Sequence, residues 1–186
     1  ASMDRNADVV IGPKARACHV GDPERSPFLE TAQTAAGSKP VMVHLGRFPH
    51  TPVITPQALL RTLRGGDIIT HAYKGRTGCL VIHGGRVRPE AWEARERGVL
   101  FDVGHGAGSF SWQVARYALE QGFPPDSIST DVHTGSINGP TINASSTPDW
   151  RNPAVSAAPI EPSRLSVGVP ISNDSNKVLF ASAGKW

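Results

Sequence analysis

Runs of β-branched residues alternate along this chain with segments that carry the start and stop signals of helices. Strands that alternate with helices are typical of parallel βαβ units, because each helix returns the chain to the start of the next strand. The alternation therefore predicts an α/β fold built on a parallel sheet. The runs predicted as strands are 7–12, 40–46, 67–73, 98–106 and 126–134, and helices are expected within 26–37, 55–66, 90–98 and 109–122.

Cap residues set the expected ends of three of these helices. Serine and threonine accept a backbone N–H at a helix start, and glycine tolerates the left-handed backbone that follows a helix end. The predicted caps are Ser26, Thr55 and Ser109 at the starts, with Pro27 and Pro56 inside the first two, and Gly37, Gly65 and Gly122 at the ends. Residues 77–90 are predicted to form a hairpin that turns at Gly84-Gly85.

A polar residue lies near the end of each predicted strand, and these residues recur at intervals of 27 to 31 positions. One βα unit is about 30 residues long. An open doubly wound sheet would suit the alternation, but a TIM-type (β/α) barrel also explains the polar residues, because its site gathers side chains from the carboxyl ends of the strands. We therefore predict a partial barrel over 1–140. The residues expected at its mouth are Lys14, His44, His71, Asp102 or His105, and Asp131.

Histidine nitrogens and carboxylate oxygens are common ligands of zinc and similar divalent ions. A lysine ammonium has no lone pair to give. Lys14 becomes a ligand only if its amine reacts with carbon dioxide to form a carbamate. A single histidine at a strand end is more often a core or loop residue, and a single lysine is more often solvated. Four such residues in successive register favour a metal site.

Composition narrows the class of protein. The 186 residues are enough for one domain with a sizeable core, and the net charge of +3 is spread along the chain. We therefore expect no nucleic-acid partner. The two cysteines form no C-x-x-C pair, which favours a reducing compartment, and neither a signal peptide nor a membrane-spanning stretch is evident. The expected location is the cytoplasm, away from the membrane.

Several segments together resemble the amidohydrolase superfamily, in its amidohydrolase/deacetylase or dihydroorotase-like branch. The segments are "VVIGPKAR", "PVMVHLG", "DIITHAYKG", "VRPEAWEARERGVLFDVGHGAGSFSWQVA" and "DSISTDVHTGSINGP". The resemblance covers residues 6 to 140, and it implies that the chain supplies strands four to eight of the barrel.

The resemblance also implies a set of roles. A carboxylated Lys14 would bridge two zinc ions, His44 and His71 would bind the second ion, and Asp131 would bind the first and act as the general acid/base. The implied reaction is two-metal hydrolysis of an amide or ester bond in a small acylated substrate. His105 and Gly106, in the glycine-rich "VGHGAGS", are substrate-binding candidates, although a tight turn explains that loop equally well. His133 is a candidate to orient Asp131, or is an ordinary loop residue.

Three departures from the family pattern leave the activity open. The strand-one motif of two histidines flanking one residue occurs nowhere in this sequence, and Ala72-Tyr73-Lys74 stand where the family commonly has an asparagine. Residues 141–186 do not resemble the family and are expected to form an irregular or disordered tail with one strand at 177–182.

Two hypotheses follow from these departures. The chain is either a metallohydrolase whose missing ligands are lost by truncation or come from another polypeptide, or an inactive fragment or pseudoenzyme. The second would bind at most one metal ion or a protein partner. A partial barrel exposes open sheet edges, so association into a homo-oligomer is also expected.

Overall fold

A computed structural model describes residues 2–44, 52–75, 80–105, 109–131 and 179–182. In chain order the elements are α1 (Ser2–Arg5), β1 (Val10–Arg16), α2 (Pro27–Ala36), β2 (Met42–His44), α3 (Pro56–Thr62), β3 (Ile68–Thr70), β4 (Ile82–His83), β5 (Arg86–Val87), α4 (Pro89–Glu96), β6 (Leu100–Phe101), α5 (Trp112–Glu120) and β7 (Leu179–Ser182). Among these residues, no helix is both long and apolar enough to cross a bilayer.

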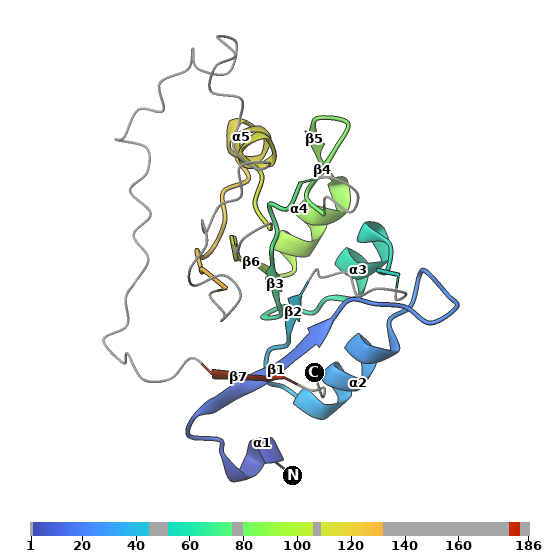
Figure 1. Cartoon of the computed structure of the whole chain (residues 1–186), viewed down its shortest axis with the longest axis vertical. Helices are drawn as coiled ribbons and strands as arrows, with labels where there is room; N and C mark the ends of the chain where they lie inside the picture. Colours follow the sequence, from blue (N-terminus) through green and yellow to red (C-terminus); the bar gives the residue numbers. More distant parts are fainter. Residues whose placement is uncertain (1, 45–51, 76–79, 106–108, 132–178, 183–186) are drawn as a thin grey trace, which may run out of the picture.

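Five strands form one parallel sheet in the order β6-β3-β2-β1-β7 (Figure 1). Along the chain, α2 lies between β1 and β2, and α3 lies between β2 and β3. The β4–β5 hairpin and α4 lie between β3 and β6. This arrangement confirms the predicted α/β class and agrees with part of a barrel. The numbering of these strands as four to eight stays a prediction.

The core lies between the sheet and its helices. Val43, Ile69 and Phe101 on neighbouring strands are fully buried, as are Leu29 of α2 and Leu59 of α3. Val43, Ile69 and Phe101 are paired across the sheet, so their side chains point to the same face. Successive residues of a strand point to opposite faces. The residues on either side of Val43 and Ile69 therefore point to the opposite face, where the strand ends are polar.

Two predicted helix starts are confirmed and one is wrong. Ser26 accepts the backbone N–H of Leu29, and Thr55 accepts that of Ala58. Helix α5 is capped by Ser111 rather than Ser109, because the hydroxyl of Ser111 accepts the N–H of Val114. Both serines precede the helical segment and are suitable N-cap residues, so the sequence alone did not distinguish them.

The predicted end of the second helix also moves. Helix α3 ends at Thr62, with Leu63 as its C-cap, and Gly65 lies beyond it. A Cβ at Gly65 would collide with the carbonyl oxygen of Arg97. Gly65 therefore does not cap the helix. Its missing side chain lets its backbone pack closely against that of Arg97.

The predicted hairpin is confirmed, with β4 paired antiparallel to β5 around Gly84 and Gly85, both at positive φ. The strand predicted at 126–134 is not confirmed. Residues 126–131 make only an isolated parallel bridge between Ser127 and Asp102, and residues 132–134 lie outside the described residues. Next to this bridge, the carboxylate of Asp126 accepts the N–H of Phe101 at 2.7 Å.

The tail contributes β7, within the strand expected at 177–182. It pairs parallel with β1, with Ser182 opposite Lys14, so this edge of the β1–β6 sheet is paired. The other residues of 141–186 lie outside the described residues, and the domain boundary at 140 stays a prediction.

Candidate metal centre

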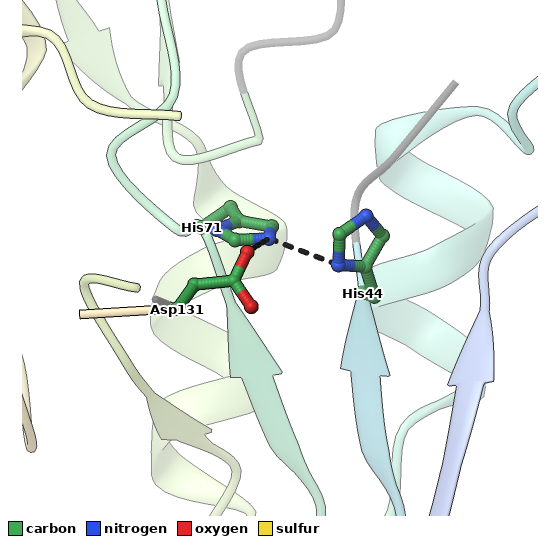
Figure 2. Close-up of side chains that lie close together, drawn as sticks. All are labelled: His44, His71 and Asp131. Atoms are coloured by element: carbon green, nitrogen blue, oxygen red, sulfur yellow. Dashed lines mark hydrogen bonds and ion pairs between the residues drawn. The ribbon is translucent and has the colours of Figure 1, made fainter. Parts of the chain in front are cut away.

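The carboxyl ends of β1, β2 and β3 lie side by side. Arg16 is in register with His44, and His44 with Thr70, the residue before His71. His44 is the last residue of β2 and His71 follows the last residue of β3. The parallel register therefore places both imidazoles at one end of the sheet. Asp131 approaches them from the segment that runs beside the end of β6 (Figure 2).

Three ligand-type side chains converge at this end. Nε2 of His71 lies 2.9 Å from Nδ1 of His44 and 3.4 Å from Oδ2 of Asp131. One nitrogen or oxygen of each of the three lies within 4.8 Å of the others. Zinc–ligand bonds of 2.0–2.1 Å in a tetrahedral site separate the ligand atoms by about 3.3 Å. The three groups therefore fit a small divalent ion after only small shifts.

Lys14 lies beside this group, with Nζ 3.9 Å from Oδ1 of Asp131. Asp131 thus faces His71 with one oxygen and Lys14 with the other. The structure brings together all four residues that the sequence placed in the metal site: Lys14, His44, His71 and Asp131.

The ring of His71 is held in one orientation. Its Nδ1 contacts the backbone carbonyl of Gly104 at 2.5 Å. Because a carbonyl only accepts hydrogen bonds, Nδ1 carries a proton and donates it. In the neutral ring Nε2 then keeps its lone pair and faces His44 and Asp131, which is the arrangement that metal-binding histidines use. In the metal-free protein, the Nδ1–H of His44 donates to this lone pair of His71. For Nδ1 of His44 to bind an ion, the proton of its ring must move to Nε2.

Both imidazoles are disfavoured as cations. Burial lowers the pKa of His44 to about 3, with further contributions from His71 and from the cations Arg16, Lys14 and Lys74. Burial also lowers the pKa of His71, against the opposing effects of the Gly104 carbonyl and Asp131. At neutral pH both rings are therefore neutral, which is the form that binds metals.

Two of the three converging residues have an uncommon backbone conformation. His71 has φ 63° and Asp131 has φ 51°, and among the described residues no other residue except glycine has a positive φ. A left-handed backbone is unfavourable for most residues and is concentrated at functional sites. These two positions lie directly after β3 at His71 and at the end of the segment 126–131 at Asp131, and both side chains lie beside His44.

Asp102, one alternative at the mouth, does not join the cluster. Its carboxylate is 2% exposed and accepts hydrogen bonds from the hydroxyls of Thr70, Ser127 and Ser129. These three hydroxyl residues were not identified from the sequence. Their only signal was the position of Thr70 and the "SIST" run next to predicted ligands.

The other alternative, His105, donates its backbone N–H to the carbonyl of Ser129. This bond ties the loop after β6 to the segment that leads to Asp131. The remaining candidates, Gly106 and His133, lie outside the described residues.

Named proteins match this chain over about three quarters of its length. A deacetylase of Enterococcus faecalis is 35% identical over 146 residues, covering 75% of this chain and 38% of that protein. A deacetylase of Brucella anthropi is 34% identical over 145 residues, covering 76% and 35%. The chain thus spans little more than a third of the length of the curated relatives it matches. No family model matches it.

Solved structures give a consistent result. The crystal structure of an adenine deaminase superposes with a TM-score of 0.62 and 33% identity, covering 74% of this chain and 38% of that one. The crystal structure of a dihydroorotase gives a TM-score of 0.61 and 31% identity, covering 75% and 37%.

Proposed function

Because about three quarters of this chain is homologous to part of an amidohydrolase-superfamily enzyme, we propose that it carries part of the active site of a metal-dependent hydrolase. The bond cleaved is an amide or ester in a small acylated molecule, as the deacetylase relatives suggest. The observation that supports this proposal most directly is the convergence of His44, His71 and Asp131 at the carboxyl end of a parallel sheet.

We propose that Lys14 acts as a carbamate. As an ammonium, it would add a third positive charge beside Arg16 and Lys74, whose fields already lower the pKa of His44. Such surroundings oppose a metal cation. After the ammonium loses one proton, the amine nitrogen of Lys14 would form a bond to the carbon of carbon dioxide and release a second proton to solvent, which would leave an anion with two oxygens and reverse its contribution. Lys14 would then bridge two zinc ions, with His44 and His71 on one ion and Asp131 on the other.

The residues of this chain have separate tasks in the reaction. A bound divalent ion supplies Lewis acidity and lowers the pKa of a coordinated water. His44 and His71, neutral through burial, supply lone pairs without first losing a proton to solvent. Asp131 accepts the proton of the attacking water on its carboxylate and returns it to the leaving nitrogen or oxygen. His105 and Gly106 are proposed to contact the substrate.

The alternative is an inactive fragment or pseudoenzyme that binds at most one ion or a protein partner. One observation favours it: the printed sequence contains no pair of histidines flanking one residue. A catalytic zinc site with three protein ligands is common, and the second ion would have Lys14, His44 and His71, whereas the first would have only Lys14 and Asp131 here.

Metal analysis and hydrolysis assays distinguish the two proposals. The purified chain is loaded with zinc in bicarbonate buffer, dialysed, and tested on acetylated amino acids and hydroxy acids. About two zinc ions per chain with hydrolysis supports the hydrolase. One ion or none, without hydrolysis, supports the inactive alternative. The variant His71→Gln is expected to lose both zinc and activity, whereas His83→Gln, at an exposed position of the β4–β5 hairpin, is expected to retain both.

A further inference from the structure

The buried carboxylate of Asp102 lies close to Gly104, the residue whose carbonyl contacts His71 of the candidate metal centre. Asp102 is 2% exposed and accepts three side-chain hydrogen bonds. The donors are the hydroxyls of Thr70 at 2.7 Å, Ser127 at 2.8 Å and Ser129 at 2.7 Å. A carboxylate only accepts, so all three hydroxyl protons point at Asp102. One side chain thereby ties the end of β3 to the segment 126–131.

Each member of this network is close along the chain to a group of the metal centre. Thr70 immediately precedes His71, and Ser129 lies two residues before Asp131. Asp102 lies two residues before Gly104, whose carbonyl accepts the Nδ1–H of His71. The network therefore contacts the segments that carry all three groups.

The network and the metal centre meet at Gly104. A Cβ at this position would collide with the hydroxyl of Thr70, and would lie 2.9 Å from Nδ1 of His71 and 3.1 Å from Oδ2 of Asp102. The glycine also has a φ of 47°. The Cα of Gly104 is thus packed between the network and the histidine, in a space that admits no side chain.

Backbone bonds connect the same segments. The N–H of Asp102 donates to the carbonyl of Ile69, and the carbonyl of Asp102 accepts the N–H of Ala72. On the other side, Val103 donates to the carbonyl of Ser127. Asp102 therefore spans the gap between β3 and the segment of Asp131 with both its backbone and its side chain.

We propose that Asp102 is a positioning residue for the candidate metal centre. Through Thr70 and Ser129 it holds the Gly104 carbonyl against Nδ1 of His71, which fixes the tautomer whose Nε2 faces His44 and Asp131. The effect on metal affinity rests on the proposed function, whereas the effect on the tautomer does not. Asp102 touches no ligand atom of the centre and acts through its neighbours.

The first test uses metal-free protein. Ring-nitrogen NMR spectra at pH 7.5 are compared for the wild type, Asp102→Asn and Asp67→Asn, with the His71 signals assigned from their loss in His71→Gln. Asp67 is an equally buried carboxylate, but it lies at the other end of β3, so its variant controls for general loss of stability. We expect the Nδ1–H tautomer in the wild type and Asp67→Asn, and a mixture of tautomers in Asp102→Asn. A wild-type tautomer in Asp102→Asn would overturn the proposal.

Two milder variants, both at Thr70, provide a second test in case Asp102→Asn does not fold. Thr70→Val removes one hydroxyl at nearly constant size, and Thr70→Ser retains the hydroxyl. Thr70→Val is expected to mix the tautomers and to weaken zinc binding about 10- to 100-fold, the usual effect of losing a group that orients a metal ligand. Thr70→Ser is expected to restore both properties. If the wild type binds no zinc, the proposed function fails and the tautomers still decide the role of Asp102. Equal tautomer populations in the two Thr70 variants would contradict that role.

Discussion

At the scale of single residues, burial decides how the two central histidines behave. His71 is fully buried and His44 partly so, and both have a lowered pKa mainly because burial penalises the charged ring. The neighbouring cations act in the same direction on His44. A site that stays neutral in this way keeps its lone pairs available below the pH at which an exposed histidine is protonated.

The same pKa shift predicts how stability depends on pH in the absence of metal. His44 titrates near 6.5 in the unfolded chain and at about 3 in the fold, so the unfolded chain binds more protons between these values. The free energy of unfolding should therefore fall as the pH drops below 6.5. In His44→Gln the loss between pH 7.5 and pH 5 should be smaller. Urea unfolding with a chelator measures it.

His83 provides the matched control for this pH experiment, because it is exposed on the β4–β5 hairpin. His83→Gln should lose as much stability as the wild type between the two pH values. Equal losses in His44→Gln and His83→Gln would show that burial of His44 does not contribute to the acid sensitivity.

Asp67 supplies a second prediction at this scale, at the end of β3 opposite the site. Its carboxylate is 1% exposed and accepts hydrogen bonds from the N–H of Val41, the side chain of Gln33, and both the backbone and guanidinium of Arg64. Burial alone would raise the pKa of Asp67, but these donors lower it overall. Asp67→Asn should reduce the free energy of unfolding by about 2–3 kcal/mol at pH 7, measured in urea.

The sign of the pH effect follows from the lowered pKa of Asp67. Its contribution is complete above the pKa of an ordinary aspartate and is lost as the pH falls through the folded value. The gap between wild type and Asp67→Asn should therefore narrow in acid. Asp8→Asn, at an exposed position, should match the wild type throughout. A gap that stays constant down to pH 2 would contradict the assignment.

At the scale of elements, two of the three predicted helix starts are confirmed, whereas contacts between distant segments were not predictable from the sequence. Ser26 and Thr55 cap their helices as predicted, because a cap depends only on residues three positions apart. Within the described part of the strand expected at 126–134, Ser127 forms one isolated bridge with Asp102, and the side chain of Asp126 accepts the N–H of Phe101. No local pattern predicts this bond from a side chain to a distant backbone group.

The candidate site shows the same division. The regular spacing of polar residues at the strand ends predicted that Lys14, His44, His71 and Asp131 meet at one end of the sheet. The same spacing also included Asp102, which bonds to hydroxyl groups instead of joining them. Their metal-binding roles stay proposals. The hydroxyl network around Asp102 was not predictable, because it depends on how three separate segments approach one another.

Strand β7 gives the prediction that belongs to this scale. It covers the outer edge of β1, whose residue Lys14 belongs to the candidate site. Ending the chain after residue 178 should expose this edge, lower the midpoint of thermal unfolding and promote association, since an unpaired edge can pair with another chain. Ending it after 182 keeps β7 and serves as the control. Thermal unfolding and size-exclusion chromatography give the comparison. Identical behaviour of the two shortened chains would show that β7 does not stabilise the sheet.

At the scale of the whole molecule, the candidate site exists only in the folded chain. His44 ends β2, His71 follows β3, and Asp131 lies 60 positions after His71 in the sequence, so no short segment carries all three. A group of ligands that forms only on folding links metal binding to stability, because an ion that binds the folded state alone shifts the unfolding equilibrium.

The size of this effect can be predicted. Zinc at 100 times its dissociation constant should raise the free energy of unfolding by about 2.7 kcal/mol, and each further tenfold increase should add about 1.4 kcal/mol. For a chain of this size, that corresponds to a rise of about 5–10 °C in the midpoint of thermal unfolding at the first concentration. His44→Gln and His71→Gln should lose most of this rise, whereas Asp8→Asn should keep it. Differential scanning calorimetry over a zinc titration measures the slope. An equal rise in His71→Gln would place the bound zinc elsewhere on the molecule, and the proposed metal centre would then be wrong.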